Sequence, residues 1–261
     1  MANGREKVTR PTLVAHRGYS QHYPENTLIA IAAALDAGAA YVEFDVQMTA
    51  DGVPVVLHDV SLRRTGGVDE RVVDLPLQRV REIVVSEPQR LGNAFPDVRV
   101  STLAEMVTLL EKRRGARAFV EVKRSSLRHF GTDIVVDRVM EDLRPVLDRC
   151  VVISFDRDAV VRARRRGAPR IGWVIETWDE GTNRDARTLA PDYLLCEHLI
   201  VPDGPTPFWP GPWRWVVYGI ADAEHARRTA QRGADFIETK AIGELLADPL
   251  LGGSEWGGET P

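Results

Sequence analysis

The chain has 261 residues, of which 44% are hydrophobic and 28% are charged, so it is long enough to bury a sizeable core. Its formal net charge is -4 and its pI is about 5.9, which excludes a global attraction to nucleic acid or to an anionic membrane surface. Any anion must therefore be recognised by a local group of basic side chains. The length is typical of one domain of about 250 residues, such as a (β/α)8 barrel.

The two ends of the chain and its cysteines suggest a location. Residues 1–10 are polar and charged, with no apolar stretch after the basic residues, so we expect no export signal. No run of about 18 apolar residues occurs, so we expect no stable membrane insertion. Cys150 and Cys196 lie in apolar runs without metal-type spacing and are expected to be buried thiols. These features favour a cytoplasmic protein, and the glycine-rich residues 252–261 are expected to be disordered.

Strand-like apolar runs alternate with helix-like stretches along the chain, which is typical of a parallel sheet. The predicted strands are Thr12–Ala15, Tyr41–Val46, Val53–Leu57, Ala118–Val122, Cys150–Phe155, Arg170–Ile175, Asp192–Leu195, Arg214–Ile220 and Asp235–Glu238. Helix-like stretches lie between most of these strands and include Leu28–Ala37, Leu103–Lys112, Asp133–Leu147, Asp156–Arg166 and Ala223–Arg232. Three of these helices are followed by a Gly-Ala pair before the next strand, with the glycine placed to end the helix.

The third predicted strand cannot join a parallel sheet. Too few residues separate Val46 from Val53 for a parallel crossover, which needs a dozen or more. Residues 53–57 must therefore run antiparallel to the second strand, as the arm of a hairpin whose turn is Asp51-Gly52. With this two-residue turn, Asp45 is expected to lie opposite His58. The remaining strands match the eight of a TIM-type (β/α)8 barrel.

Two segments interrupt the regular alternation. Residues 61–101 are too long for a simple loop and are predicted to form a small helical cap, inserted into a single barrel domain that spans residues 1–261. Residues 201–213 hold five prolines around Phe208 and Trp209 and are predicted to form a rigid aromatic loop.

Ionisable side chains stand at the C-terminal ends of the first three barrel strands, where the active sites of such barrels are built. They are His16 and Arg17 on the first strand, Glu43 and Asp45 on the second, and Glu121 and Lys123 on the third. The spacing of two residues within the second and third pairs turns both side chains to the same side of the strand. The hairpin arm ends at His58, so we expect all these groups to converge on one mouth.

The carboxylates among these residues predict a metal site. Carboxylate oxygens are the ligands that Mg²⁺ and Ca²⁺ prefer, whereas Zn²⁺ more often binds histidine or cysteine. Glu43, Asp45 and Glu121 therefore predict a divalent cation, either Mg²⁺ or Ca²⁺.

The basic and imidazole groups predict phosphoester chemistry. Arg17 and Lys123 complement phosphate oxygens, arginine through its planar fork and lysine as a point charge. His16 and His58 can accept and donate protons near neutral pH. Together with a cation that neutralises charge on phosphoryl oxygens, they predict phosphoester cleavage by general acid–base catalysis.

The other histidines and the run of arginines at residues 162–166 are interpreted as structural. Loop or exposed helix positions are expected for His22, His129, His198 and His225, of which His198 comes nearest to a strand end. The arginines are expected to form a solvated helix end that the helix dipole favours.

The order of these motifs resembles that of the glycerophosphodiester phosphodiesterases. The resemblance covers almost the whole chain and rests on His16-Arg17-Gly18, Pro24-Glu25-Asn26-Thr27, Glu43-Phe44-Asp45-Val46, Thr49-Ala50-Asp51-Gly52, Val55-Val56-Leu57-His58-Asp59, Leu62-Arg63-Arg64-Thr65, Glu121-Val122-Lys123, Ser154-Phe155 and the segment Gly233 to Thr239.

This resemblance implies a TIM-type barrel that hydrolyses a glycerophosphodiester to glycerol phosphate and an alcohol. The roles that it implies are acid and base for His16 and His58, binding of the divalent cation for Glu43, Asp45 and Glu121, and binding of the phosphodiester for Arg17 and Lys123, with Asn26 supporting the same site. The substrate is then a small molecule.

Two late segments depart from the family pattern. They are Trp215-Val216-Val217-Tyr218 and Glu238-Thr239-Lys240. We expect both to lie on the late-strand half of the mouth, away from the metal and the histidines. There they bear on the alcohol group of the substrate and leave the reaction class unchanged.

Two other functions fit the same residues. A phospholipase D acting on lysophospholipids would share the barrel and both histidines, and it would need an apolar trough for the acyl chain. The candidates for this trough are Phe208, Trp209, Trp213 and Trp215. A non-catalytic phosphate-binding barrel would need no imidazole pair, so the presence of both histidines argues against it. The residues are compatible with direct attack by water and with attack by a glycerol hydroxyl through a cyclic phosphate.

Overall fold

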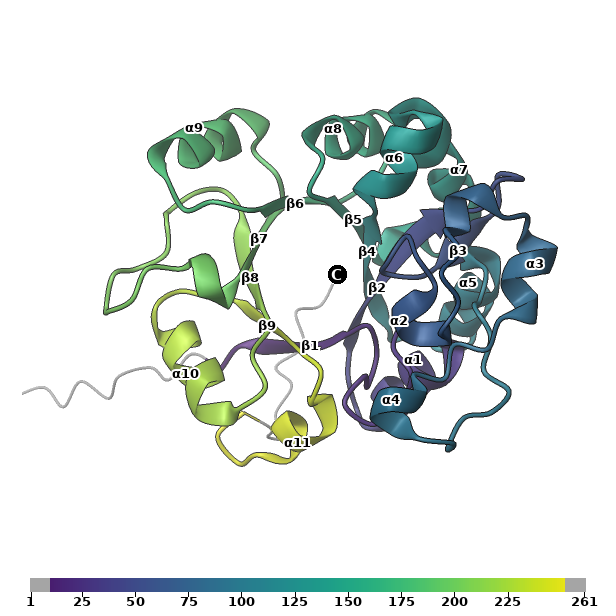
Figure 1. Ribbon diagram of the computed structural model, residues 1–261. Helices are drawn as coiled ribbons and strands as arrows, with labels where there is room; N and C mark the ends of the chain where they lie inside the picture. The colour runs from purple at the N-terminus through teal and green to yellow at the C-terminus, as the bar shows by residue number, and fades with distance from the viewer. Residues whose placement is uncertain (1–9, 252–261) are drawn as a thin grey trace, which may run out of the picture.

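The computed structural model describes residues 10–251 and forms a closed barrel. One sheet contains nine strands, and all of them except β3 run parallel around the barrel, because β1 pairs with both β2 and β9. Figure 1 looks along the barrel axis. The barrel strands are β1 (Thr12–His16), β2 (Tyr41–Met48), β4 (Arg117–Val122), β5 (Cys150–Ser154), β6 (Ile171–Ile175), β7 (Tyr193–Glu197), β8 (Arg214–Tyr218) and β9 (Phe236–Thr239). The prediction of a TIM-type barrel is confirmed.

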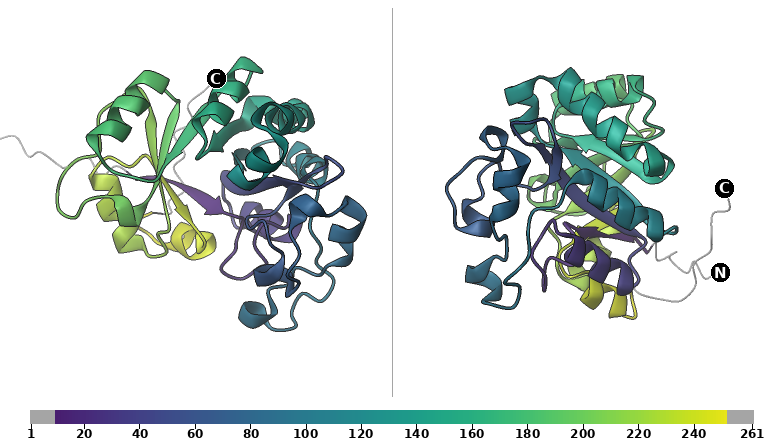
Figure 2. Two further views of the ribbon diagram at one scale, coloured as in Figure 1. Left: turned by 45° about the horizontal axis from the view of Figure 1, so that its top comes forward. Right: turned by 90° about the vertical axis from the view of Figure 1, so that its right-hand side faces the viewer.

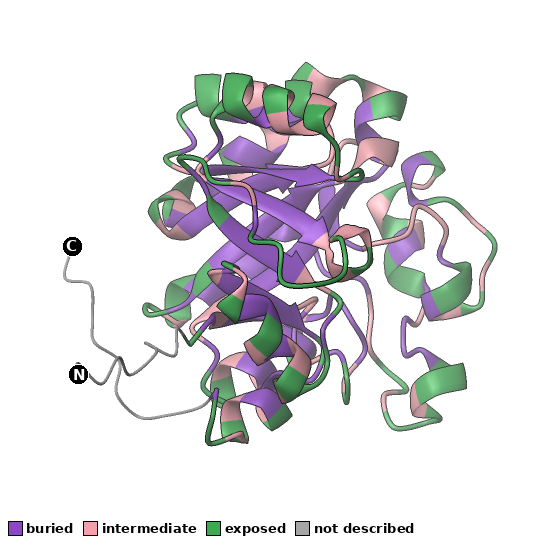
Figure 3. Cartoon of the chain, turned by 90° about the vertical axis from the view of Figure 1, so that its left-hand side faces the viewer, coloured by how far each residue is buried: buried purple, intermediate pink, exposed green. Residues whose placement is uncertain are grey.

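Helices form a layer outside the barrel, with their exposed faces turned to solvent (Figure 3). They are α1 (Leu28–Asp36), α5 (Leu103–Lys112), α6 (Arg124–Phe130), α7 (Thr132–Leu143), α8 (Arg157–Arg165), α9 (Glu180–Leu189), α10 (Ala223–Gln231) and α11 (Ile242–Ala247), with short 3-10 turns at η2 (Arg144–Arg149) and η3 (His198–Ile200). None of the helix-like stretches named from the sequence corresponds to α6, α9 or α11. Helix α9 buries only Ala186 and is polar over most of its length, so it offers few apolar residues that could mark a helix in the sequence.

Side chains that point inward fill the end of the barrel opposite the mouth. Phe119, Tyr193 and Phe236 meet edge to face, with ring centroids 5.1 to 5.8 Å apart. All three belong to the apolar cluster inside the barrel. Because successive side chains of a strand alternate between faces, the residues two positions after Phe119 and Phe236 also point inward, one layer nearer the mouth.

The hairpin turn differs from the expected two-residue turn. Strand β3 (Pro54–Val56) is antiparallel to β2, as expected. The Thr49 N–H donates to the Val53 carbonyl at 3.0 Å, so three residues, and not Asp51 and Gly52 alone, form the loop. Gly52 adopts a left-handed conformation with φ +76°, as the last residue of a three-residue hairpin loop commonly does.

This extra loop residue shifts the strand register by one position. The Leu57 N–H donates to the Asp45 carbonyl at 3.0 Å, so Leu57 is the residue that lies opposite Asp45. The prediction that Asp45 faces His58 directly across the hairpin is wrong. His58 follows one residue later and reaches the mouth from the loop after β3.

The segment between β3 and α5 has its own short helices and its own apolar cluster. Its elements are α2 (Arg63–Gly66), η1 (Val72–Asp74), α3 (Leu77–Glu82) and α4 (Pro88–Leu91). The cluster contains valines, leucines and Ile83 of this segment together with Val55 of β3. Figures 1 and 2 show the segment at the rim beside β2 and β3, rather than across the barrel axis.

The aromatic loop at 201–213 packs against the outside of the barrel. Phe208 and Trp215 both contact Trp178, with ring centroids 5.4 and 5.2 Å apart. Trp215 belongs to the outer apolar cluster, whereas the next residue, Val216, belongs to the inner one. These aromatic side chains therefore cover the outer face of β8 and do not form a trough at the mouth.

Two simpler observations complete the fold. Cys150 and Cys196 are buried and free, as predicted. Within residues 10–251, the helices are too short or too polar to cross a lipid bilayer.

The turn after β1 leaves no room for a side chain at Gly18. We expect Gly18→Ala to destabilise the protein by about 1–2 kcal/mol, because Gly18 has φ +81°, and by about a further 1–3 kcal/mol from overpacking. The overpacking arises because an added Cβ would lie 2.5 Å from the backbone carbonyl carbon of Ala30. Urea unfolding of both variants measures the loss, with Gly38→Ala as the control, since Gly38 has φ +100° and open space around it. Equal losses in the two variants would show that the contact with Ala30 is unimportant.

Candidate active site

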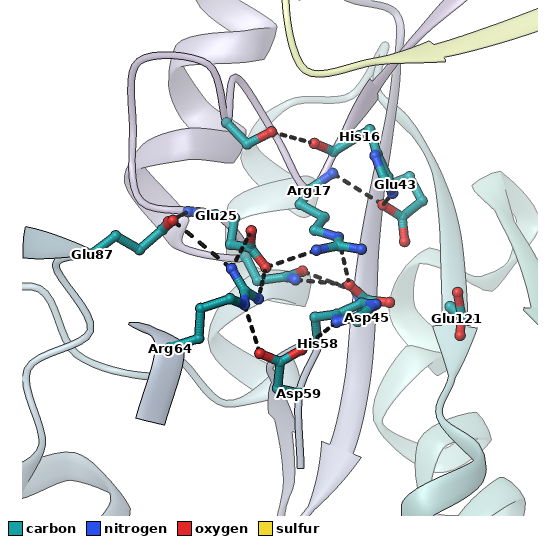
Figure 4. Close-up of polar contacts among 12 residues, drawn as sticks. His16, Arg17, Glu25, Glu43, Asp45, His58, Asp59, Arg64, Glu87 and Glu121 are labelled. Carbon is teal, nitrogen blue, oxygen red and sulfur yellow. Dashed lines mark hydrogen bonds and ion pairs between the residues drawn. The ribbon is translucent and has the colours of Figure 1, made fainter. Parts of the chain in front are cut away.

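The C-terminal ends of the barrel strands surround one pocket that opens at the mouth. Counted to its open rim, the pocket holds about 370 Å³. Its lining residues are His16, Arg17, Glu43, His58, Glu121, Ile153, Phe155, Val174, Leu195, Tyr218 and Glu238. Five of the eight site residues that the sequence suggested line this pocket, and the other three, Asp45, Lys123 and Asn26, contact each other or the lining residues. Figure 4 shows most of these side chains.

Three buried carboxylates meet beside the pocket. One oxygen from each of Glu43, Asp45 and Glu121 lies within 4.8 Å of the other two. Burial and the charge of Asp45 raise the pKa of Glu43 well above its usual value. Burial also raises the pKa of Glu121. Burial alone would raise the pKa of Asp45, but the charges of Lys123 and Arg17 hold it below its usual range.

These carboxylates fit a divalent cation. Oxygens that lie within 4.8 Å of one another can share a Ca²⁺ ion at roughly 2.3–2.6 Å from each oxygen. Burial, together with the charge of Asp45, raises the pKa values of Glu43 and Glu121, so both carboxylates are costly to ionise without a further positive charge. A hard cation would compensate it through ligands of the type that it prefers.

Two basic side chains reach the same carboxylates. Lys123 Nζ lies 3.0 Å from Asp45 Oδ1 and 2.6 Å from Glu121 Oε1. Arg17 Nε lies 3.3 Å from Asp45 Oδ2, and the Arg17 backbone N–H donates to Glu43 Oε2 at 3.0 Å. Arg17 adopts a left-handed conformation with φ +59°, and such strain in a residue other than glycine clusters at functional sites.

The Asn26 side chain reaches the three carboxylates through Asp45. Its side-chain amide donates to Asp45 Oδ2 at 2.8 Å, and its side-chain oxygen accepts from the Asp45 backbone N–H at 3.0 Å. Asn26 is 2% exposed and does not line the pocket. Both ends of its amide are therefore used to fix the position of Asp45.

His58 is held by a chain of polar contacts that continues into the segment between β3 and α5. Its Nδ1 lies 2.6 Å from Asp59 Oδ1, and its carbonyl accepts from Gln47 Nε2 at 3.0 Å. Asp59 in turn accepts from Arg64 Nε at 2.6 Å, and Arg64 also donates twice to Glu25 (Figure 4). With Nδ1 engaged by Asp59, Nε2 is the ring nitrogen of His58 that is available to a ligand in the pocket.

His16 ends β1 and is paired in register with Glu43 of β2. Its Nε2 lies 3.8 Å from Glu43 Oε2, and its Nδ1 is buried without a hydrogen-bond partner among residues 10–251. Burial and the charge of Arg17 lower the pKa of His16 well below its usual value. His16 and His58 line the same pocket.

Two pocket residues from the last strands were not expected there. Glu238 offers an oxygen within 4.8 Å of ligand atoms of His16 and Glu43, and the ring of Tyr218 lies 6.0 Å from that of His16. The prediction that the departing late segments lie away from the histidines is therefore wrong for these two residues. Barrel closure is the reason, since β9 pairs directly with β1. The signal available in the sequence was a carboxylate at the C-terminal end of the last predicted strand.

The four histidines interpreted as structural do not line this pocket. Two of them, His198 and His225, contact each other at 4.9 Å between ring centroids. His22 pairs with Glu244 at 2.6 Å, and His129 packs on Phe130.

The sequence of this chain is similar to a known protein family and to several of its members. The model of the glycerophosphoryl diester phosphodiesterase family matches residues 16–206. Glycerophosphodiester phosphodiesterase 1 of Rattus norvegicus is 46% identical over 99 residues, which cover 38% of this chain and 30% of that protein. The chain thus spans less than half the length of the mammalian relatives that it matches. A glycerophosphodiester phosphodiesterase of Bacillus altitudinis is 34% identical over 167 residues, covering 64% of this chain and 66% of that protein.

The fold has close counterparts among solved structures. A phosphodiesterase of Oleispira antarctica, determined in complex with the product sn-glycerol-3-phosphate, superposes with a TM-score of 0.77. It is 21% identical, and the match covers 90% of this chain and 95% of that one. Because the family model matches well over half of the sequence and the barrel agrees with it, the chain belongs to the glycerophosphoryl diester phosphodiesterase family.

Proposed function

We propose that this protein hydrolyses a glycerophosphodiester to glycerol phosphate and an alcohol with the help of a divalent cation, Mg²⁺ or Ca²⁺. The observation that carries the proposal is the gathering of carboxylates, two imidazoles and an arginine around one pocket at the barrel mouth. Membership of the family and its named relatives support the same reaction.

We assign the cation to the oxygens of Glu43, Asp45 and Glu121. When bound there, it would neutralise charge on the phosphoryl oxygens. Arg17 and Lys123 hold the phosphodiester. Lys123 already contacts Asp45 and Glu121, so its ammonium group binds the phosphate while it keeps contact with these carboxylates. Asn26 acts as a positioning residue for Asp45, because its amide is fully engaged there.

We assign proton transfer to His16 and His58, one taking a proton from the attacking hydroxyl and the other giving one to the leaving alkoxide. Asp59 holds the His58 ring through Nδ1 and so presents Nε2 to the substrate. The attacking hydroxyl comes from water or from the glycerol moiety of the substrate. A cyclic glycerol phosphate formed in a single turnover would identify the second route.

A direct assay tests the proposal against its lipid alternative. We expect release of choline and glycerol phosphate from glycerophosphocholine to exceed turnover of lysophosphatidylcholine. The physical reason is that the candidate acyl trough is absent from the mouth, since Phe208, Trp213 and Trp215 are buried in the outer apolar cluster. A strong preference for the lysophospholipid would overturn the first choice.

We also propose that residues 61–101 serve as a cap within a single barrel domain, linked to the mouth through Arg64. We expect Arg64→Lys to lower kcat by about 10- to 100-fold with little change in KM, because a small misplacement of His58 is costly. The single ammonium group of lysine cannot donate to Asp59 and Glu25 at the same time with the geometry that the planar guanidinium of arginine provides.

Steady-state kinetics of two neighbouring variants measures this effect. The control is Arg63→Lys, because the Arg63 side chain is 76% exposed and, among residues 10–251, forms an ion pair with Asp69 alone. Equal activity of the two variants would show that Arg64 does not position His58.

A further inference from the structure

The pocket contains one buried carboxylate that the proposed reaction does not use. Glu238 ends β9, is 2% exposed and lines the pocket. Its Oε1 atom has no hydrogen-bond partner among residues 10–251, and no basic side chain in that range forms an ion pair with it. A buried polar oxygen without a partner costs free energy, so a ligand that supplies a donor would be favoured there.

The barrel itself directs this side chain into the pocket. Phe236 lies in the inner apolar cluster, and the two-residue alternation turns Glu238 to the same face, one layer nearer the mouth. The register pairs Glu238 with Val14 of β1 and with Tyr218 of β8. Glu238 and Tyr218 therefore form a continuous polar wall beside His16.

The rest of the pocket suggests what this wall could bind. Ile153, Val174 and Leu195 line the pocket with apolar atoms, while Glu238 and Tyr218 offer oxygens. A short carbon chain that carries hydroxyl groups matches both surfaces, since its carbons contact the apolar side chains and its hydroxyls donate to the carboxyl group. The Glu238 oxygen can accept such a hydrogen bond in either protonation state.

A second cation is the competing occupant, because oxygen or nitrogen atoms of His16, Glu43 and Glu238 lie within 4.8 Å of one another. That arrangement would take the imidazole of His16 as a metal ligand and remove it from proton transfer. It would also place two cations on the single Glu43 carboxylate. A bound hydroxyl group would leave His16 available for proton transfer and would leave one cation on Glu43.

We propose that Glu238, with Tyr218 beside it, forms a hydroxyl-binding subsite that holds the glycerol moiety of the substrate next to His16 and makes Glu238 a specificity-determining residue. This inference rests on the proposed function and names the part of the substrate that the last strands recognise.

The subsite is tested by a double-mutant cycle in which one change is made at Glu238 and the other removes a hydroxyl group from the substrate. The substrates are glycerophosphocholine and the analogue that lacks the terminal hydroxyl of its glycerol moiety, because the 2-hydroxyl is the attacking group of the cyclic-phosphate route and must stay in both. We expect the wild-type enzyme to prefer the first by about 3- to 100-fold in kcat/KM, the range that spans hydrogen bonds to neutral and to charged carboxyl groups. Glu238→Ala should lose activity on the first substrate by a similar factor and on the analogue by much less.

The controls separate a binding role from a structural one. Glu197→Gln changes another strand-end glutamate that does not line the pocket and should leave both activities and their ratio unchanged. Thermal unfolding of Glu238→Gln and Glu238→Ala checks folding. Equal losses on both substrates in Glu238→Ala would overturn the subsite, because a structural defect does not distinguish them.

Two further measurements distinguish the remaining explanations. If Glu238→Ala weakens the activation constant for Mg²⁺ or Ca²⁺ by tenfold or more while the substrate preference stays, Glu238 is a metal ligand and the subsite is wrong. If the wild-type enzyme cleaves neither diester, the proposed function fails separately. Calorimetric binding of glycerol 3-phosphate and of 2-hydroxypropyl phosphate to wild type and Glu238→Ala then still decides the subsite, which requires a preference in the wild type that the variant loses.

Discussion

Replacement of His58 by alanine is expected to lower kcat by about 10²- to 10⁴-fold, the usual contribution of a general acid or base. We expect a loss in the same range for His16→Ala. Both imidazoles line the pocket, and His58 is further oriented by Asp59. Steady-state assays on glycerophosphocholine, with unfolding curves to show that each variant is folded, measure the effect.

A third histidine supplies the matched control for these variants. His198 follows β7 directly and contacts His225, but it does not line the pocket. We expect His198→Ala to leave turnover nearly intact. Unchanged activity of His16→Ala and His58→Ala would instead revive the non-catalytic phosphate-binding barrel, since the observed turnover would then come from a contaminant.

Removal of divalent cations is expected to abolish activity, and Mg²⁺ or Ca²⁺ should restore it. Three buried carboxylates, Glu43, Asp45 and Glu121, each place one oxygen within 4.8 Å of the other two, and oxygens arranged in this way are the ligands that a hard cation prefers. Glu43→Gln should weaken activation by the cation by more than tenfold, because even residues that only support metal ligands typically contribute 10- to 100-fold to affinity. Chelation followed by titration with each cation measures both effects.

The control for this prediction is a glutamate outside the pocket. Glu176 follows β6 and pairs with Arg124 at the surface, so Glu176→Gln should keep the wild-type activation constant. Activity that survives exhaustive chelation would argue against a metal-dependent reaction. Restoration by Zn²⁺ alone would show that the all-oxygen ligand set is wrong.

The strands were predictable because the pattern that marks each of them lies within a few consecutive residues. Buried parallel strands appear as short apolar runs, and all nine predicted runs correspond to strands of the barrel or hairpin. The helices were less predictable where they bury little, as in α9 with Ala186 alone. The predicted helix from Asp133 to Leu147 divides into α7 and η2, and Pro145, which cannot donate a backbone hydrogen bond, lies just after the division.

The hairpin shows how one residue of turn geometry changes a site prediction. The sequence signal at Asp51-Gly52 located the turn, but the number of loop residues depended on the Thr49–Val53 pairing. That pairing places Leu57 opposite Asp45 and moves His58 one position beyond it. Side chains alternate along a strand, so such a shift changes which residues face each other.

By itself the sequence determined the barrel class and the family resemblance, and it indicated which strand ends carry ionisable groups, because apolar runs and two-residue spacing are local properties. Tertiary structure alone decided which groups meet across the mouth. Closure of the barrel joins β9 to β1 and brings Glu238 to His16, although 222 positions separate them in the numbering. Packing of the 61–101 segment at the rim brings Arg64 to Asp59 and Glu25 in the same way. Such contacts depend on chain closure and packing, which no local pattern of residues encodes.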